Sequence, residues 1–200
     1  EVMEAELAAL EESSSNYSSH QFAIMTKARR HAEILKVPTM VEMIEDLYDE
    51  GISPVVFVNF TDTVEAIEKQ LAKNSKFNGK IAKIVGGQSD KDRQNDIDTF
   101  QKDTKRILIA NLAAGNAGVS LHDLNGNHPR HSIISPSYSA INLLQALGRI
   151  HRAGGKTPCI QKIMFAAGTI EEDACRKVQA KLQNLDALND GDLAYSLRIV

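Results

Sequence analysis

The chain has 200 residues, of which 42% are hydrophobic and 24% charged, the balance of an ordinary globular protein. A net charge of −3 and a pI near 6.1 exclude a histone-like, broadly basic nucleic-acid binder but are compatible with a local basic groove. Two cysteines without CxxC spacing, no signal-peptide pattern and no membrane-length apolar run predict an intracellular protein of the cytoplasm or nucleus, without a membrane partner. Because the chain starts at Glu1 rather than Met, we expect it to be a segment of a longer protein.

The first 53 residues contain good helix formers interrupted by one polar run. The expected segments are a helix over 1–12, a linker over 13–19, a basic helix over 20–36 and a helix with Pro38 in its first turn that ends at Gly51. We therefore expect an N-terminal helix with a flexible linker at 1–19 and a helical lead-in at 20–53.

From residue 54 onward, short β-branched runs alternate with segments of helical periodicity. The expected strands are 54–60, 80–86, 106–110, 132–135 and 159–167. The expected helices are 61–73 with Thr61 or Asp62 as N-cap, 89–101 capped by Ser89, 139–152 capped by Ser139, and 169–185. This alternation predicts an α/β fold over 54–187, a mostly parallel sheet with helices on both faces, followed by a tail at 188–200. Ligands of such sheets bind at the carboxyl ends of the strands.

The string QALGRIHRAGG, residues 145–155, brings cations together in an acidic protein. Three- and four-residue steps relate Gln145, Gly148, Arg149 and Arg152, and on a helix such steps share one face. Paired guanidinium groups suit a terminal phosphate, although a solvated basic helix end is the alternative. The following GGKT string is not a phosphate-binding loop, because Ile150 occupies the position of the required first glycine and a helix precedes the string. It predicts a helix C-cap and a turn.

The 145–155 string resembles motif VI of superfamily 2 helicases, most closely the Swi/Snf-type ATPases, whose pattern is Q-A-x-x-R-x-H-R-x-G-Q. Gly155 stands where that family usually has Gln. The similarity extends over about 36–187, with segments similar to motif IV (54–67), to G-x-[ST]-x-x-x-R…F (85–100), to motif V (107–121) and to the passage after motif VI (166–173). The Lys36-Val37-Pro38 string and the A-x-N-x-G pattern at Ala114, Asn116 and Gly118 are most similar to the annealing-helicase-like branch.

This resemblance implies a RecA-like three-layer fold and the second of two motor lobes. It also implies ATP and Mg²⁺ held mainly by the first lobe, and DNA as a partner, with duplex DNA favoured over RNA. We find no Walker A or Walker B string, so the chain alone should not hydrolyse ATP.

By resemblance, the site residues fall into three groups. The expected catalytic residues are Arg149 and Arg152 as arginine fingers and Gln145, which would position the γ-phosphate or the water. The expected ATP-binding residues are Gly115, Gly118 and Gly148. The expected nucleic-acid-binding residues are Asn59, Thr61, Gly87, Ser89, Asn116 and Ser120. Ala117 replaces an acidic residue that many family members carry.

Three further readings complete the prediction. No metal site is expected, because His122, Asp123, His128 and His131 match no standard zinc spacing. One rival function is a non-catalytic nucleic-acid-binding or assembly module. Another is the motor part of a restriction or phage DNA-processing enzyme, which sequence alone does not separate from a remodelling motor.

Overall fold

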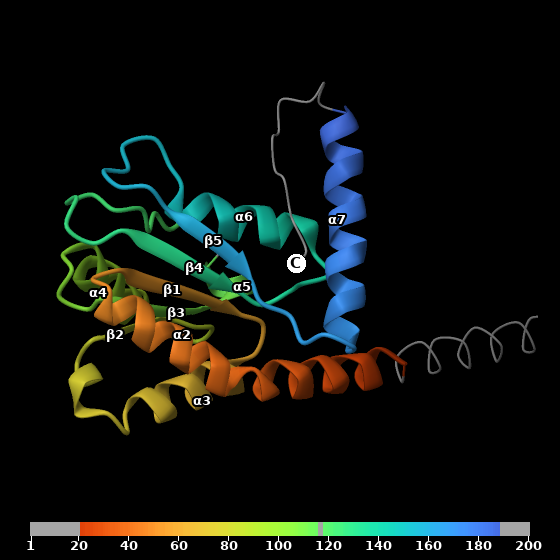
Figure 1. The fold of residues 1–200 in the computed structure, drawn as a ribbon, viewed down its shortest axis with the longest axis horizontal. Helices are drawn as coiled ribbons and strands as arrows, with labels where there is room; N and C mark the ends of the chain where they lie inside the picture. Colours follow the sequence, from red (N-terminus) through yellow and green to blue (C-terminus); the bar gives the residue numbers. More distant parts are fainter. Residues whose placement is uncertain (1–20, 116–117, 189–200) are drawn as a thin grey trace, which may run out of the picture.

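A five-stranded parallel sheet in the order β2-β3-β1-β4-β5 forms the centre of the computed structural model, which describes residues 21–115 and 118–188 (Figure 1). The strands are β1 (Ser53–Val58), β2 (Ile81–Ile84), β3 (Ile107–Asn111), β4 (Arg130–Ile134) and β5 (Ile160–Ile163). Parallel pairing of β1 with β3 and β4 buries all six residues of β1. The order places β1 at the centre, as its unbroken apolar run predicts.

Helices cover both faces of this sheet. They are the helical residues 21–35, α2 (Val37–Asp49), α3 (Thr61–Leu71), η1 (Ser75–Phe77), α4 (Asp90–Gln101), α5 (Leu112–Gly115), α6 (Ala140–Ile150) and α7 (Ile170–Leu188). One core packs α2 and α3 against the sheet, and a second packs α4, α6 and α7 against the opposite face. This three-layer arrangement confirms the predicted α/β fold.

The helical lead-in and α7 meet beyond the carboxyl edge of the sheet. Figure 1 shows residues 21–35 extending α2 past the strand ends, where the first turn of α7 crosses them. α2 begins with Pro38 in its first turn and ends before Gly51, whose φ of 82° lies in the left-handed region, as predicted. Within the described ranges, no helix is long and apolar enough to cross a membrane.

Several element ends differ from the prediction. α3 starts after Phe60, which makes no side-chain cap, so neither Thr61 nor Asp62 is the N-cap; the carboxylate of Glu33 accepts the Phe60 amide instead. α6 ends two residues earlier than predicted, because His151 has an extended backbone. The predicted caps Ser89 and Ser139 are confirmed, each accepting the amide three residues ahead.

Some predictions fall on residues that the structure does not describe. The helix over 1–12, the linker over 13–19, the tail beyond 188, Asn116 and Ala117 lie outside the described residues. They remain predictions.

Candidate functional site

The candidate residues in the segments after β1 and β2 lie at the carboxyl edge of the parallel sheet. Arg149 and Arg152 lie at the end of α6, which starts after β4 and runs back to the amino edge, where β5 begins (Figure 1). Two clusters of charged side chains lie at these opposite edges. One consists of Arg149 and Arg152 with the segment after α5, and the other joins the lead-in helix to the start of α7.

Two arginines hold the segment after α5. The Arg149 side chain is only 7% exposed, and its Nη1 donates to the carbonyl oxygen of Val119 at 3.3 Å. Arg152 is exposed, and its Nη1 donates to Ser120 Oγ at 2.6 Å while its Nε donates to Gly148 O at 3.2 Å. The motif V-like and motif VI-like strings therefore meet at Ser120.

The two guanidinium groups act on each other electrostatically. Burial and the neighbouring charge of Arg152 both lower the pKa of Arg149. Burial disfavours a charged side chain, and a nearby like charge disfavours it further.

Arg152 does not share a helical face with the other motif residues, contrary to the prediction. α6 ends before His151, whose φ of −111° and ψ of 102° turn the chain away, so Arg152 lies in the following turn. Gln145, Gly148 and Arg149 lie three and four residues apart within α6 and therefore share one face of it, as predicted, although Gln145 is exposed and Arg149 is buried. The hydrogen bond to Gly148 keeps Arg152 close to the helix end.

The expected ATP-binding glycines lie in open positions or at a helix end. Gly118 is exposed and has a φ of 66°, and no atom lies within 4 Å of a Cβ added to it or to Gly148. Gly115 is the last residue of α5. A side chain at Gly118 would be strained by its backbone conformation, while Gly148 lies in a helix and has room for one.

The segment after β2 contributes capping rather than a free polar group. The Ser89 hydroxyl accepts the amide of Asp92 at 3.1 Å and donates to its carboxylate at 2.7 Å, while Gly87 is exposed with a φ of 78°. Arg93 donates from Nη2 to the carbonyl oxygen of Ala114 at 2.6 Å, which ties α4 to α5. No contact between Gly87 or Ser89 and the two arginines is found among the described residues.

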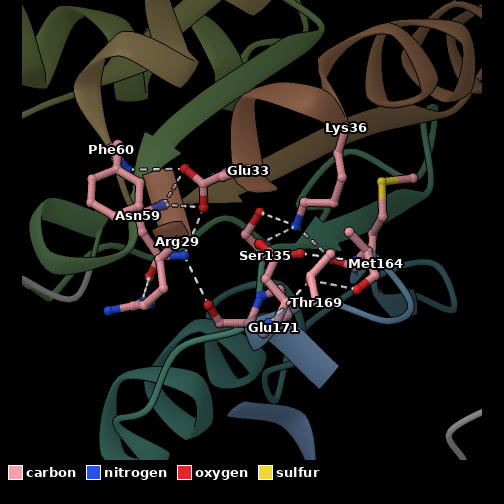
Figure 2. Close-up of polar contacts among 11 residues, drawn as sticks. Arg29, Glu33, Lys36, Asn59, Phe60, Ser135, Met164, Thr169 and Glu171 are labelled. Carbon is pink, nitrogen blue, oxygen red and sulfur yellow. Dashed lines mark hydrogen bonds and ion pairs between the residues drawn. The ribbon is translucent and has the colours of Figure 1, made fainter. Parts of the chain in front are cut away.

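A carboxylate occupies the loop after β1. Glu33 is fully buried and accepts hydrogen bonds from the amides of Asn59 and Phe60 and from Asn59 Nδ2, at 2.7 to 3.1 Å (Figure 2). Asn59 Nδ2 also donates to Pro136 O at 2.9 Å, and Arg29 donates to Asn59 Oδ1 at 3.3 Å. The Asn59 side chain is thus engaged inside the protein.

The amides of Asn59 and Phe60 are therefore not available to a nucleic-acid phosphate. Thr61, the other residue predicted from this loop, is exposed, and its Oγ1 lies 3.4 Å from Asn111 Oδ1 at the end of β3. Of this pair, only Thr61 presents its side chain to solvent.

A buried ion pair joins the lead-in helix to α7. Lys36 and Glu171 are 6% and 3% exposed, and Lys36 Nζ lies 2.8 Å from Glu171 Oε1 (Figure 2). Lys36 Nζ also donates to Ser135 Oγ at 3.1 Å and to Met164 O at 2.9 Å. Glu171 Oε2 accepts the amide of Ala166 at 2.9 Å. The carboxyl ends of β4 and β5 are thereby tied to both helices.

Burial dominates the electrostatics of this pair. It lowers the pKa of Lys36, although the carboxylates of Glu171 and Glu33 act in the opposite direction. Burial also raises the pKa of the nearby Cys175 thiol to about 11. Both cysteines are free thiols.

The histidine-containing loop before β4 has a structural arrangement. The Asp123 carboxylate accepts the amides of Asn125 and Gly126 at 3.0 Å and the Thr157 hydroxyl at 2.8 Å. His128 Nδ1 lies 2.6 Å from the carbonyl oxygen of Gly51. Over residues 21–115 and 118–188, no group of three or more His, Cys, Asp or Glu side chains could hold a metal ion.

Comparison with known families decides the assignment. The family model described as "Helicase conserved C-terminal domain" matches residues 35–154, which is 60% of the chain. The chain belongs to this helicase C-terminal domain family. The match spans the central strands and both arginines, and it ends at the turn that follows Arg152.

Relatives of this helicase C-terminal domain include viral and animal proteins. A "Putative ATP-dependent RNA helicase" of Acanthamoeba polyphaga mimivirus is 37% identical over 185 residues, covering 92% of this chain and 33% of the viral protein. A "DNA repair and recombination protein RAD54-like" of Drosophila ananassae is 30% identical over 118 residues, covering 59% of this chain and 14% of the fly protein. The chain thus spans a third or less of the length of these relatives.

A solved structure supports the fold. The C-terminal part of the Fun30 ATPase domain superposes with a TM-score of 0.59 at 24% identity and covers 72% of this chain and 44% of its own. Together with the sequence relatives, it confirms a RecA-like C-terminal lobe of the superfamily 2, Swi/Snf type. The closer similarity to the annealing-helicase branch remains a prediction.

Sequence reasoning missed most of the network around Lys36 in this helicase domain. Lys36 was singled out only as part of a family string, and Glu171 only as an acid in a first helical turn. Glu33 carries no local signal, because its partners lie 26 and 27 positions away. Only the tertiary structure brings these residues together.

Proposed function

We propose that the chain is the second motor lobe of an ATP-dependent DNA translocase or helicase and acts inside the cell. The observation that carries the proposal is the close approach of Arg149 and Arg152 at the segment after α5, where Arg152 lowers the pKa of Arg149. Two permanently charged forks held in this way suit the terminal phosphates of a nucleotide.

In this proposal, the nucleotide and Mg²⁺ are bound mainly by a first lobe of the same protein, and this chain completes the site. Arg152, which is exposed, would approach the γ-phosphate, and Arg149 would stabilise it from within the lobe. Such fingers raise turnover by about 10³ to 10⁵ in related nucleotide hydrolases. Gln145 would position the γ-phosphate or the attacking water, and Gly118 and Gly148 leave room for close approach of the nucleotide.

The nucleic-acid contact is proposed for Thr61, Gly87, Ser120 and the segment containing Asn116. Such contacts to the phosphate backbone are largely independent of sequence. The relatives are named both as RNA and as DNA proteins, and we propose duplex DNA because the RAD54-like relatives share the Swi/Snf type. RNA is the second candidate, favoured by the name of the viral relative.

The test is ATP hydrolysis by this chain alone and by the whole protein with its first lobe, with no nucleic acid, with duplex DNA and with duplex RNA. We expect no turnover by the chain alone, and turnover by the whole protein that duplex DNA increases. Stronger stimulation by RNA would reassign the substrate. No hydrolysis by the whole protein under any condition would make the domain a binding or assembly module and overturn the proposal.

A further inference from the structure

Two cations from different helices converge on one tyrosine ring at the carboxyl edge. The guanidinium carbon of Arg29 lies 5.1 Å from the ring centroid of Tyr138 and 5.8 Å from that of Phe60. The Lys177 ammonium lies 5.5 Å from the same Tyr138 centroid. Arg29 is further oriented by its hydrogen bond to Asn59 Oδ1. Figure 2 shows Arg29 beside Asn59 and Phe60, at the loop after β1.

The cations on the lead-in helix and on α7 differ in whether a carboxylate pairs with them. Among the side chains of these two helices whose burial is described, the exposed or half-exposed lysines and arginines are Lys27, Arg29, Arg30, Arg176 and Lys177. Arg30 pairs with Asp62, and Arg176 pairs with Glu172 at 2.6 Å. In the part of the chain that the structure describes, neither Arg29 nor Lys177 forms an ion pair.

The carboxylates nearby do not neutralise these two cations. Glu33 is buried against backbone amides, and the exposed Asp173 acts on Tyr138 without forming an ion pair in the described ranges. Aromatic faces stabilise Arg29 and Lys177 in the absence of an anion. Both cations are thus positioned but keep their full charge for an external anion.

The position of this pair indicates which anion it binds. Tyr138 precedes the N-cap of α6, and Arg149 lies near the other end of that helix. At 1.5 Å per residue, about 14 Å separates Ala140, the first residue of α6, from Arg149. A single nucleotide bound at Arg149 is too short for its phosphates to contact both regions. A polymer with phosphates along its length can contact both.

We propose that Arg29 and Lys177, held against Tyr138, bind a phosphodiester of the nucleic-acid backbone. Because Glu33 occupies the amides of the loop after β1, the backbone is gripped there by side chains of the lead-in helix and α7. This inference rests on the proposed function and identifies the side chains that would contact the nucleic acid near this loop.

The test compares two charge-matched double variants of the whole protein. Arg29→Gln with Lys177→Gln removes the pair, whereas Arg30→Gln with Arg176→Gln removes two ion-paired cations from the same helices. The affinity for a fluorescent DNA duplex is measured by anisotropy at several salt concentrations between about 50 and 200 mM. Over this range, binding that depends on backbone phosphates weakens strongly. Excess ATP in one series distinguishes a nucleotide site from a backbone site.

We expect the Arg29/Lys177 variant to bind on the order of ten-fold more weakly and to lose about 0.9 of the log–log salt slope for each missing phosphate contact. The control should keep the wild-type slope within about half a unit. Because Lys177 is exposed, Lys177→Gln alone should lose one contact without a change in melting temperature.

Equal slopes in the two double variants would overturn the inference while leaving the proposed function intact. So would an effect on ATP affinity in place of DNA affinity. Absence of DNA binding by the wild-type protein would instead remove the proposed function on which the inference rests.

Discussion

Two charged clusters, one at each edge of the sheet, are built in opposite ways. Around Lys36, opposite charges meet in the interior: the ion pair with Glu171 spans 2.8 Å, and Lys36 also donates to the oxygen atoms of Ser135 and Met164. Around Arg149, burial and a second cation, Arg152, both lower the pKa of the guanidinium. The first cluster joins opposite charges, and the second brings two like charges together.

This difference separates a structural role from a binding role more clearly than burial does. Lys36 and Arg149 are similarly buried, at 6% and 7% exposure. A buried charge with a good partner holds elements together, and removal of either member leaves an uncompensated charge. Like charges in a cleft raise the energy of the empty protein and are typical of functional sites. The comparison therefore predicts which variants lose stability and which lose activity.

The largest effect is expected for the exposed member of the arginine pair. Arg152→Ala in the whole protein should lower DNA-stimulated turnover by about 10³-fold or more, because the developing charge on the phosphate loses a fixed cation. Binding of a fluorescent ATP analogue should change little. Arg176→Ala, which removes an exposed cation on α7, is the control and should keep wild-type turnover. Turnover by Arg152→Ala within a factor of two of wild type would contradict the finger assignment.

The next effect concerns stability in the paired cluster. Lys36→Met should lower the free energy of unfolding by about 3–5 kcal/mol, because Glu171 then remains buried without a counter-charge. Lys83→Met, which breaks the exposed Lys83–Glu68 pair, should cost less than about 1 kcal/mol. Both values are obtained from urea unfolding curves. Equal losses in the two variants would show that burial of the pair has no special effect.

The paired cluster should also suppress the reactivity of its thiol. Because burial raises the pKa of Cys175 to about 11, we expect alkylation at pH 8 to be about 100-fold slower than for an unperturbed thiol. The rate should keep rising until pH is near 11. Since the folded state favours the neutral thiol, its contribution to stability is present below the ordinary thiol pKa of 9.0 and is lost as pH rises toward the folded-state pKa of about 11. Mass spectrometry of alkylated peptides measures the rate, and a rate that levels off near pH 8.5 would disagree.

The smallest effect distinguishes capping from nucleic-acid binding at Ser89. Ser89→Ala should lower the free energy of unfolding by about 1 kcal/mol, because the first turn of α4 loses its side-chain cap. Ser89→Asp restores a cap and should recover that loss while adding a negative charge. If Ser89 also contacts a phosphate, Ser89→Asp will weaken DNA binding, and unchanged binding would limit Ser89 to its structural role.

Much of the fold follows from the sequence because it depends on local periodicity and capping. The apolar run of β1, the Ser89 and Ser139 caps and the Gly51 helix end all appear where local chemistry predicts them. The contact of Arg152 with Ser120 was not predicted from the sequence. What sequence could not supply is long-range pairing, such as Glu33 with Asn59 or Lys36 with Glu171. The end of α6 was also predicted wrongly. The helical spacing of the sequence continues to Arg152, but the backbone becomes extended at His151.

The most direct test measures turnover and stability together in Arg149→Met and Lys36→Met, two substitutions that each remove one buried cation. For Arg149→Met, we predict a loss of DNA-stimulated turnover of about 10³-fold per folded molecule. For Lys36→Met, we predict a stability loss of about 3–5 kcal/mol with near-wild-type turnover per folded molecule. Preserved turnover in folded Arg149→Met, or lost turnover in folded Lys36→Met, would contradict the division into a structural and a binding cluster.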